Sequence, residues 1–431
     1  MNIQMSFVIR HWSLVVYSLL FALCPSLYAP YSMLFAQTKI GAQVFFEQHL
    51  TLVAGKRVGV LCNSSSIVFS DAAGIIENKN LVDALLEKKV NVTAIFSPEH
   101  GFRSNVSAGE KIENQIDSAS RIPIFSLYGK TLKPTSEMLH DIDILLFDLQ
   151  DVGSRYFTYA STMGLAMEAA SEYGKIFIIL DRPNPIGGNA VEGFIREDSL
   201  QSFVGKFPLP NRHGLTLGEL ATMIVGEKWI PNSEQLNLKI IPCENWNREV
   251  FWNDTQLAWI PPSPNILSPT TALVYAGSCL FEGTNISEGR GTEFPFQMLG
   301  APFVDNQLWM EEIEQREMEG VEISPISFIP RVDSLRAISP KYADKLCNGI
   351  FLHITDIKKF KPFETAYSLL VTLHVVAKDS LQFNGKQFDR LAGTTKFRYA
   401  IESGKSAEEF SLMWKEEAEK FLKKRKRYLL Y

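Results

Sequence analysis

The sequence predicts an α/β fold in which a Rossmann-like, doubly wound parallel sheet is followed by a second, smaller α/β domain. The chain has 431 residues, of which 46% are hydrophobic, so it can bury a sizeable core. Short apolar runs alternate with amphipathic segments through the first half of the chain. A proline-rich stretch then separates this pattern from a second one. These observations favour two α/β domains over one repeated or all-helical structure.

Short apolar runs predict the buried strands of the first sheet. These runs lack the polar alternation of a strand that faces water on one side. They are found at 57–62, 92–96, 122–127, 143–149 and 175–180. Helical spacing lies between them at 80–89, with Asn80 as the expected N-cap, and at 159–173. Strands that alternate with helices indicate a parallel sheet with both faces covered.

The rest of the chain predicts a second domain. After a helix at 214–227 and a strand at 236–241, the sequence IPPSPNILSP at 260–269 interrupts regular structure. We therefore expect a Rossmann-like domain over 38–268 and a smaller α/β domain over 269–431 that completes the cleft. The elements expected in the smaller domain are strands within 321–330 and 349–355 and helices at 364–378 and 407–424.

The N-terminus differs from the rest of the chain. Arg10 and His11 precede the apolar stretch WSLVVYSLLFALC, which is short for a membrane span and fits the apolar region of a secretory signal. We expect residues 1–36 to be a signal peptide or an N-terminal anchor, and the protein to be exported to the periplasm or beyond. No stable membrane span is expected after the leader is removed. The four remaining cysteines are widely spaced, which favours buried free thiols.

Charge and motifs make several partners improbable. The net charge of −5, without a long basic face, gives no support for nucleic acid binding. The basic run at 423–427 is expected to be the solvated end of the last helix. The sequence contains no GxGxxG, GxxxxGK[ST] or HExxH motif, so neither a nucleotide cofactor nor a metal is expected. A nucleotide-dependent enzyme on the Rossmann layer stays an alternative.

Three polar clusters directly follow predicted strands. They are SPEHG at 97–101, DLQDVGSRYFTY at 148–159 and DRPNP at 181–185. Because the carboxyl ends of parallel strands border one crevice, we expect these clusters to lie together. In SPEHG, Glu99 is a candidate general acid with His100 beside it. The alternative is a hydrogen-bonded turn in which Glu99 caps a helix or pairs with Arg103.

Polar residues around these strand ends are candidates for substrate binding. Planar groups that form paired hydrogen bonds, and aromatic faces that stack on a ring, suit a sugar that carries a carboxylate. Rigid turns and structural ion pairs would give the same pattern. The candidates are Asp148, Gln150, Arg155, Tyr156, Tyr159, Asp181, Arg182, Asn184, Arg212 and His213. The glycine-rich run FEGTNISEGRGTEFPF adds Glu288, Arg290 and Glu293.

Six motifs together resemble the NamZ-type exo-β-N-acetylmuramidases, formerly a family of unknown function. In chain order they are SPEHGF, DLQDVGSRYFTY, DRPNPIGG with VEG, RHGLTLGELA, PPSPN and EGTNISEGRGT. The resemblance runs from about residue 40 to the C-terminus. It implies an exported glycoside hydrolase that removes N-acetylmuramic acid from the non-reducing end of peptidoglycan fragments such as MurNAc-GlcNAc. It also implies that the active cleft lies between the two domains.

The resemblance implies roles for some of these residues. Glu99 matches the expected general acid, with His100 orienting it or sharing its proton. The second catalytic carboxylate stays open among four residues, with Glu192 placed first: Glu192, Glu293, Glu168 and Asp148. Four arginines could bind the lactyl carboxylate of the sugar: Arg155, Arg182, Arg212 and Arg290. Retaining, inverting and substrate-assisted mechanisms all stay possible, and a non-catalytic cell-wall saccharide-binding protein is an alternative function.

Overall fold

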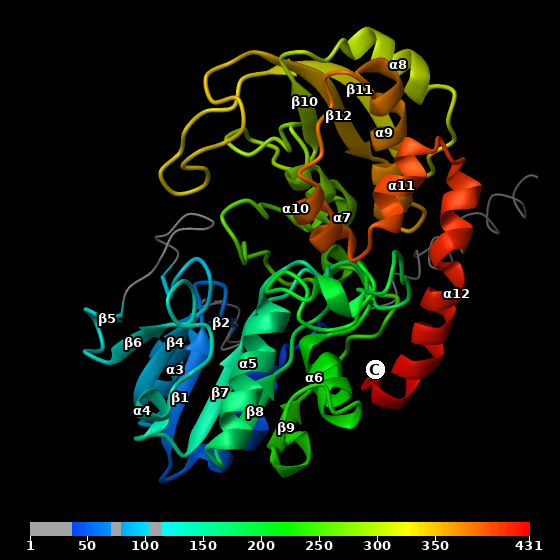
Figure 1. Ribbon diagram of the computed structural model, residues 1–431. Coiled ribbons are helices and arrows are strands. Elements are labelled where there is room, and N and C mark those ends of the chain that lie inside the picture. The colour runs from blue at the N-terminus through cyan, green and yellow to red at the C-terminus, as the bar shows by residue number, and fades with distance from the viewer. Residues whose placement is uncertain (1–36, 70–78, 104–113) are drawn as a thin grey trace, which may run out of the picture. The chain divides into compact units, whose positions relative to one another are not determined.

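The computed structural model describes residues 37–69, 79–103 and 114–431 (Figure 1). Within this part, Thr38–Tyr431 form one compact unit. The predicted signal peptide or anchor at 1–36 lies outside the described residues. Among the helices that are described, none is both long enough and apolar enough to cross a membrane.

The first sheet has seven strands in the order β5-β6-β4-β1-β7-β8-β9. Neighbouring strands are parallel except at the edge, where β5 is antiparallel to β6. The order reverses beside β1, which places a topological switch point between β1 and β7. The predicted doubly wound sheet is therefore confirmed, with all six predicted strands present. The strands are β1 (Arg57–Cys62), β4 (Asn91–Ser97), β5 (Gln115–Ile116), β6 (Pro123–Ser126), β7 (Ile144–Asp148), β8 (Ile176–Leu180) and β9 (Asn237–Ile241).

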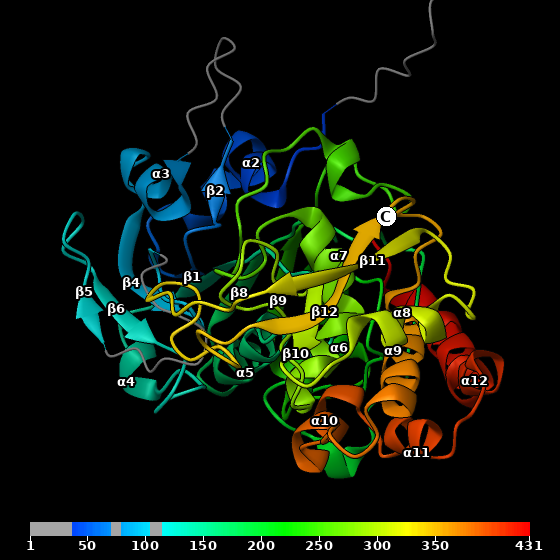
Figure 2. The same ribbon diagram turned by 90° about the horizontal axis from the view of Figure 1, so that it is seen from above.

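Both faces of this sheet are buried under helices. Strand β7 illustrates this, since Ile144 and Leu146 pack into one apolar cluster and Leu145 and Phe147 into another. Figure 2 shows α2 and α3 on one face of the sheet and α5 on the other. Asn80 caps α3 as predicted, because its side chain accepts a hydrogen bond from Val82 N–H at 3.0 Å. The helices around the sheet are α2 (Gly41–Val44), α3 (Leu81–Glu87), α4 (Ser136–Leu139), α5 (Tyr159–Glu172) and α6 (Leu217–Gly226).

The later part of the chain builds a three-stranded antiparallel sheet in the order β10-β12-β11, with α8 packed on it and α9 packed against α8 and α7. A second, smaller α/β domain is thus confirmed, while its exact boundaries stay predictions. Its elements are α7 (Pro269–Ser278), β10 (Met298–Ala301), α8 (Asn306–Ile313), β11 (Val321–Phe328), β12 (Cys347–Ile354), α9 (Pro362–Val376), α10 (Gly385–Ala392), α11 (Lys396–Glu402) and α12 (Ala407–Arg425).

Several of these elements were not predicted from the sequence. Helix α7 begins inside the proline-rich stretch that was read as a break. Ser268 caps it by accepting from Thr271 N–H at 3.0 Å, and Pro269 occupies its first turn, where its missing N–H costs nothing. Strand β10 and helices α8, α10 and α11 are four to eight residues long, too short for a clear periodic signal.

The C-terminal helix α12 returns to the first sheet and ends beside α6 (Figure 1). The basic run at its end was expected to be solvated, and for Arg425 this was wrong. Arg425 is 4% exposed and donates to the backbone carbonyls of His213 and Gly214 at 2.8 and 2.9 Å. Arg425 therefore joins the last helix to the loop before α6, because buried backbone carbonyls need hydrogen-bond donors.

The cysteine prediction is confirmed for the residues that the structure describes. Cys62, Cys243, Cys279 and Cys347 are buried and free. A core of this size is stable without disulfides, so the thiols act as small apolar side chains.

Candidate active site

The motif SPEHG forms a tight turn at the carboxyl end of β4. The turn is closed by a hydrogen bond from Gly101 N–H to Pro98 O at 3.1 Å. His100 has φ of 75°, in the left-handed region where a side chain other than glycine is strained. Such strain persists only where the surrounding structure holds it, and it concentrates at functional sites. The turn therefore presents Glu99 in a fixed position just beyond the strand.

Glu99 and His100 line a cavity of about 620 Å³. This volume is within the range of pockets that bind small molecules. Aromatic and aliphatic side chains from both the earlier and the later part of the chain form much of the cavity wall. They are Tyr128, Tyr156, Phe157, Phe203, Val204, Ile266, Tyr275, Phe296 and Ile338. The enclosure gives a sugar both ring-stacking faces and a few polar groups of fixed orientation.

The carboxylate of Glu99 is held by hydroxyl groups. Its Oε2 accepts a hydrogen bond at 2.8 Å from Oγ1 of Thr158, which immediately precedes α5. The hydroxyl of Tyr128 is also hydrogen-bonded to Glu99, and burial together with this carboxylate raises the pKa of Tyr128. Tyr128 thus stays protonated at neutral pH. These contacts fix the orientation of the Glu99 carboxylate at the cavity.

A second carboxylate, Glu282, lines the same cavity and is bound to Arg290. It lies in the 3₁₀ turn Cys279–Gly283 after α7, and its Oε1 accepts from Arg290 Nη2 at 2.7 Å. Glu288 is 3.4 Å from Arg290 Nε and 3.0 Å from Lys341 Nζ. Burial opposes the charge of Arg290, but these two glutamates raise its pKa above the ordinary value. Glu282 is therefore held beside the guanidinium of Arg290 at the cavity wall.

Four of the residues predicted for the site line the cavity, namely Glu99, His100, Tyr156 and Arg290. The Tyr156 hydroxyl donates to the backbone carbonyl of Tyr275 at 3.0 Å. The hydroxyl hydrogen is therefore already used, and the aromatic ring is the part of Tyr156 that contributes to the cavity wall. Glu288 does not line the cavity itself, but it contacts Arg290, which does. Tyr159 lies just outside, where its hydroxyl donates to Pro262 O at 2.5 Å.

Two predicted arginines are instead structural. Arg155 is 2% exposed and donates to the carbonyls of Phe194, Leu209 and Leu391 at 2.6 to 2.9 Å. Burial lowers the pKa of its guanidinium to about 9. Arg212 forms a buried ion pair with Glu192 at 2.8 Å. Both hold loops together and are absent from the cavity wall.

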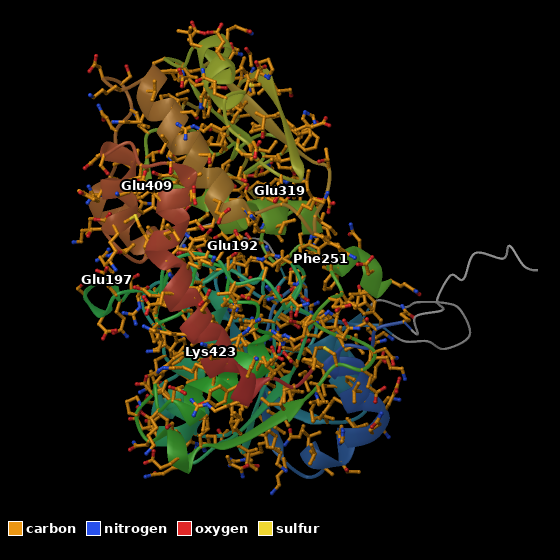
Figure 3. The ribbon with its side chains drawn as sticks, turned by 90° about the vertical axis from the view of Figure 1, so that its right-hand side faces the viewer. Glu192, Glu197, Phe251, Glu319, Glu409 and Lys423 are labelled. Atoms are coloured by element: carbon orange, nitrogen blue, oxygen red, sulfur yellow. The ribbon has the colours of Figure 1, made fainter. Side chains whose placement is uncertain are left out.

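Glu192, the first candidate for the second catalytic carboxylate, is not brought to Glu99. Besides Arg212 it accepts from Phe363 N–H, at the start of α9, at 3.2 Å. Figure 3 labels Glu192 among the loops beside α9 and α12. Burial raises its pKa although Arg212 opposes the shift. Its position makes it a link between the domains.

The remaining candidates for the second carboxylate also lie away from the cavity wall. Asp148 is fully buried and bound to Arg182 at 2.5 and 2.9 Å. Glu168 faces Lys133 at 2.8 Å on the surface of α5. Glu293 is exposed and does not line the cavity.

Other predicted binding residues organise the carboxyl ends of β7 and β8. Asp181 accepts from Thr216 Oγ1 at 2.6 Å and Gly218 N–H at 2.8 Å, and burial raises its pKa to about 6. Asn184 Nδ2 donates to Leu215 O at 3.0 Å, and Gln150 Nε2 to Pro183 O at the same distance. These side chains fix the loops that were predicted to bind substrate.

His213 belongs to the same buried layer. Its Nδ1 accepts from Leu215 N–H at 3.1 Å, and its Nε2 is 3.8 Å from Asp151 Oδ2. Burial lowers the pKa of His213 to about 3 and raises that of Asp151 to about 7. The imidazole is therefore neutral at physiological pH and serves as a backbone anchor.

Several polar residues of the cavity wall were not among the binding candidates from the sequence, including Glu282, Asn265 and Arg336. Glu282 and Asn265 occur inside quoted motifs, but no spacing rule separates them from their neighbours. Arg336 lies in a stretch without any motif. Within the described residues no cluster of three or more His, Cys, Asp or Glu side chains is placed to hold a metal.

Comparison with known sequences gives matches to one family over most of the chain. A family model described as "Exo-beta-N-acetylmuramidase NamZ, N-terminal" matches residues 58–270, and its C-terminal counterpart matches residues 273–431. The chain is also similar to the peptidoglycan β-N-acetylmuramidase NamZ of Bacillus subtilis strain 168. The two are 39% identical over 397 residues, which cover 92% of each chain.

Solved structures give the same result. Two crystal structures of DUF1343 family proteins from Bacteroides fragilis NCTC 9343 superpose on this chain with TM-scores of 0.81 and 0.73. Their sequences are 34% and 36% identical to it, and each match covers 92% of this chain and 99% of the other. The fold of the matched part of the chain is therefore shared with experimentally determined structures.

Proposed function

The chain belongs to the NamZ family of exo-β-N-acetylmuramidases and is a peptidoglycan glycoside hydrolase, and we propose that Glu99 is its general acid. The reaction is release of N-acetylmuramic acid from the non-reducing end of peptidoglycan fragments such as MurNAc-GlcNAc. The observation that carries the assignment of Glu99 is its position in the cavity. It lies on a strained turn at a strand end, held by the hydroxyls of Thr158 and Tyr128.

The chemistry of the bond requires a proton donor. Cleavage of a glycosidic bond leaves an alkoxide on the departing sugar, and a carboxylic acid within hydrogen-bond reach protonates it as the bond breaks. Glu99 and Glu282 are the carboxyl groups of the cavity wall in the described part of the chain. Because Glu282 is already hydrogen-bonded to the guanidinium of Arg290, we assign proton donation to Glu99.

We assign Glu282 to the stabilisation of positive charge. The transition state of glycoside hydrolysis resembles an oxocarbenium ion, and a fixed anion close to it lowers its energy. This assignment is compatible with a covalent intermediate, with inversion and with assistance from the acetamido group of the substrate. Analysis of the anomer released from MurNAc-GlcNAc distinguishes inversion from the other two.

Removal of the charge of Glu282 should weaken catalysis moderately. We expect Glu282→Gln to lower kcat/KM by about 10-fold to 100-fold, the size of a lost hydrogen bond to a charged group. The loss should be smaller than that of a general acid, because Arg290 already balances part of the charge. Initial rates on a chromogenic MurNAc glycoside measure it. Wild-type kinetics in Glu282→Gln would remove this residue from the mechanism.

The reaction itself is tested by its products. We expect the purified protein to release N-acetylmuramic acid from MurNAc-GlcNAc and to leave GlcNAc-MurNAc intact, since an exo-enzyme acts on the terminal residue. Chromatography with mass detection measures the sugars released from each of the two disaccharides. Binding of MurNAc-GlcNAc without any release of sugar would instead indicate a cell-wall saccharide-binding protein.

Export is a further part of the proposal and is supported by the sequence alone. Peptidoglycan fragments are encountered outside the cytoplasm, and residues 1–36 carry the apolar stretch of a secretory signal or anchor. We expect the mature protein in the periplasm or the medium. Mass spectrometry of its N-terminus tests this, and recovery of the unprocessed chain from the cytoplasm would contradict it.

A further inference from the structure

We propose that Arg336 recognises the lactyl carboxylate of muramic acid and thereby determines the preference for N-acetylmuramic acid over N-acetylglucosamine. The two sugars differ in the lactyl ether at C3, which carries a carboxylate. This inference rests on the proposed function, because it concerns the specificity of the same cavity. None of the arginines that the sequence favoured for this task meets its requirements.

The charge balance of the cavity wall favours Arg336. Two arginines line the cavity in the described part of the chain, Arg290 and Arg336. Arg290 and Lys341 face Glu282 and Glu288, so this cluster of two cations and two anions is already neutral. A substrate carboxylate placed there would meet two carboxylates in competition. Arg336 is exposed and forms no ion pair among the described residues, so its charge is available to an anion.

The backbone around Arg336 is held, which presents the side chain at the cavity. Its N–H donates to Asp333 Oδ1 at 3.1 Å, and its carbonyl accepts from Asn265 Nδ2 at 2.7 Å. Asp333 and Ala337 are joined by two backbone hydrogen bonds of 2.9 and 2.8 Å. The guanidinium is therefore carried by a fixed turn, and ordering it around a ligand costs only side-chain entropy.

Asn265 gives the site a second polar contact suited to the same sugar. It is 1% exposed and lines the cavity, and its Oδ1 is buried without a hydrogen-bond partner. An unsatisfied buried acceptor is costly and is relieved by a donor from a ligand. The acetamido N–H at C2 is adjacent to the lactyl group at C3. Asn265 Nδ2 is hydrogen-bonded to the backbone carbonyl of Arg336, so the two residues lie next to each other and are placed to contact these two neighbouring substituents.

The inference is tested with two chromogenic substrates, the 4-nitrophenyl glycoside of MurNAc and its lactyl methyl ester. The ester removes the charge and keeps the size of the group almost unchanged. We expect the wild type to prefer the free acid, and Arg336→Met to reduce the acid-to-ester ratio of kcat/KM by about 10-fold to 100-fold. The change should be in KM, since the carboxylate is remote from the bond that breaks. Arg336→Lys should retain an intermediate ratio because it keeps the charge but loses the paired geometry.

Arg331→Met is the matched control. Arg331 lies in the same segment, is exposed and pairs with Asp344 at 2.6 Å, but it does not line the cavity. We expect it to keep the wild-type ratio. An unchanged ratio in Arg336→Met, or an equal loss in Arg331→Met, would overturn the inference. A wild type that hydrolyses acid and ester equally would also overturn it while the proposed function stands, whereas hydrolysis of neither would end both.

Discussion

Replacement of Glu99 by glutamine is expected to lower kcat on MurNAc-GlcNAc by about 100-fold to 10,000-fold, the range of a lost general acid. Glutamine keeps the shape of the side chain and an acceptor for Thr158 Oγ1, but it cannot donate a proton to a departing alkoxide. KM should change little, because the substrate contacts remain. Initial rates of N-acetylmuramic acid release measure the effect, with circular dichroism and thermal unfolding to verify the fold.

Glu293→Gln is the matched control for this experiment. Glu293 is an exposed carboxylate of the glycine-rich run and does not line the cavity. The same chemical change at this position should leave kcat within about twofold of the wild type, as expected for a surface substitution. A normal rate in Glu99→Gln would exclude Glu99 from proton transfer.

Arg182→Met is expected to lower the free energy of unfolding by about 3 to 5 kcal/mol. Asp148 is fully buried, and Arg182 provides two hydrogen bonds to its carboxylate at 2.5 and 2.9 Å. Methionine fills similar space but leaves Asp148 as an uncompensated charge. Urea unfolding at neutral pH, followed by circular dichroism, measures the change.

Two further variants sharpen this prediction. The double variant Asp148→Leu with Arg182→Met removes both charges and should recover much of the lost stability. Arg331→Met breaks an exposed pair, whose members are 64% and 65% exposed, and should cost at most about 1 kcal/mol. A loss below about 1 kcal/mol in Arg182→Met, together with an increased KM, would indicate that Arg182 binds substrate as the sequence suggested.

The sequence was most informative where the physics is local. Short, continuous apolar runs predicted every interior strand of the large sheet, because a strand buried on both faces consists mostly of apolar residues. The position of Glu99 followed from the same pattern, because a polar cluster after a strand of a parallel sheet must lie at the crevice. Short elements such as β10 and α11 depend on contacts made by distant segments, and their own residues do not specify them.

The functional residues could be predicted only in part for a related reason. An arginine in a polar motif has the same appearance whether it binds a substrate or satisfies buried carbonyls. Arg155 illustrates this, since its three backbone acceptors come from positions up to 236 residues away. Conversely, Glu282 and Arg336 reach the cavity because α7 and the segment after β11 fold against the first sheet's crevice. The spacing of residues along the chain does not predict that these distant segments meet at the cavity.

The most direct test of the central claim compares leaving groups in the wild type and in Glu99→Gln. The substrates are MurNAc-GlcNAc, whose leaving alkoxide needs a proton, and the 2,4-dinitrophenyl glycoside of MurNAc, whose phenolate leaves without one. If Glu99 is the general acid, Glu99→Gln loses about 100-fold or more in kcat/KM on the disaccharide and much less on the activated glycoside. An equal loss on both substrates would contradict this role and would leave Glu99 as a binding or positioning residue.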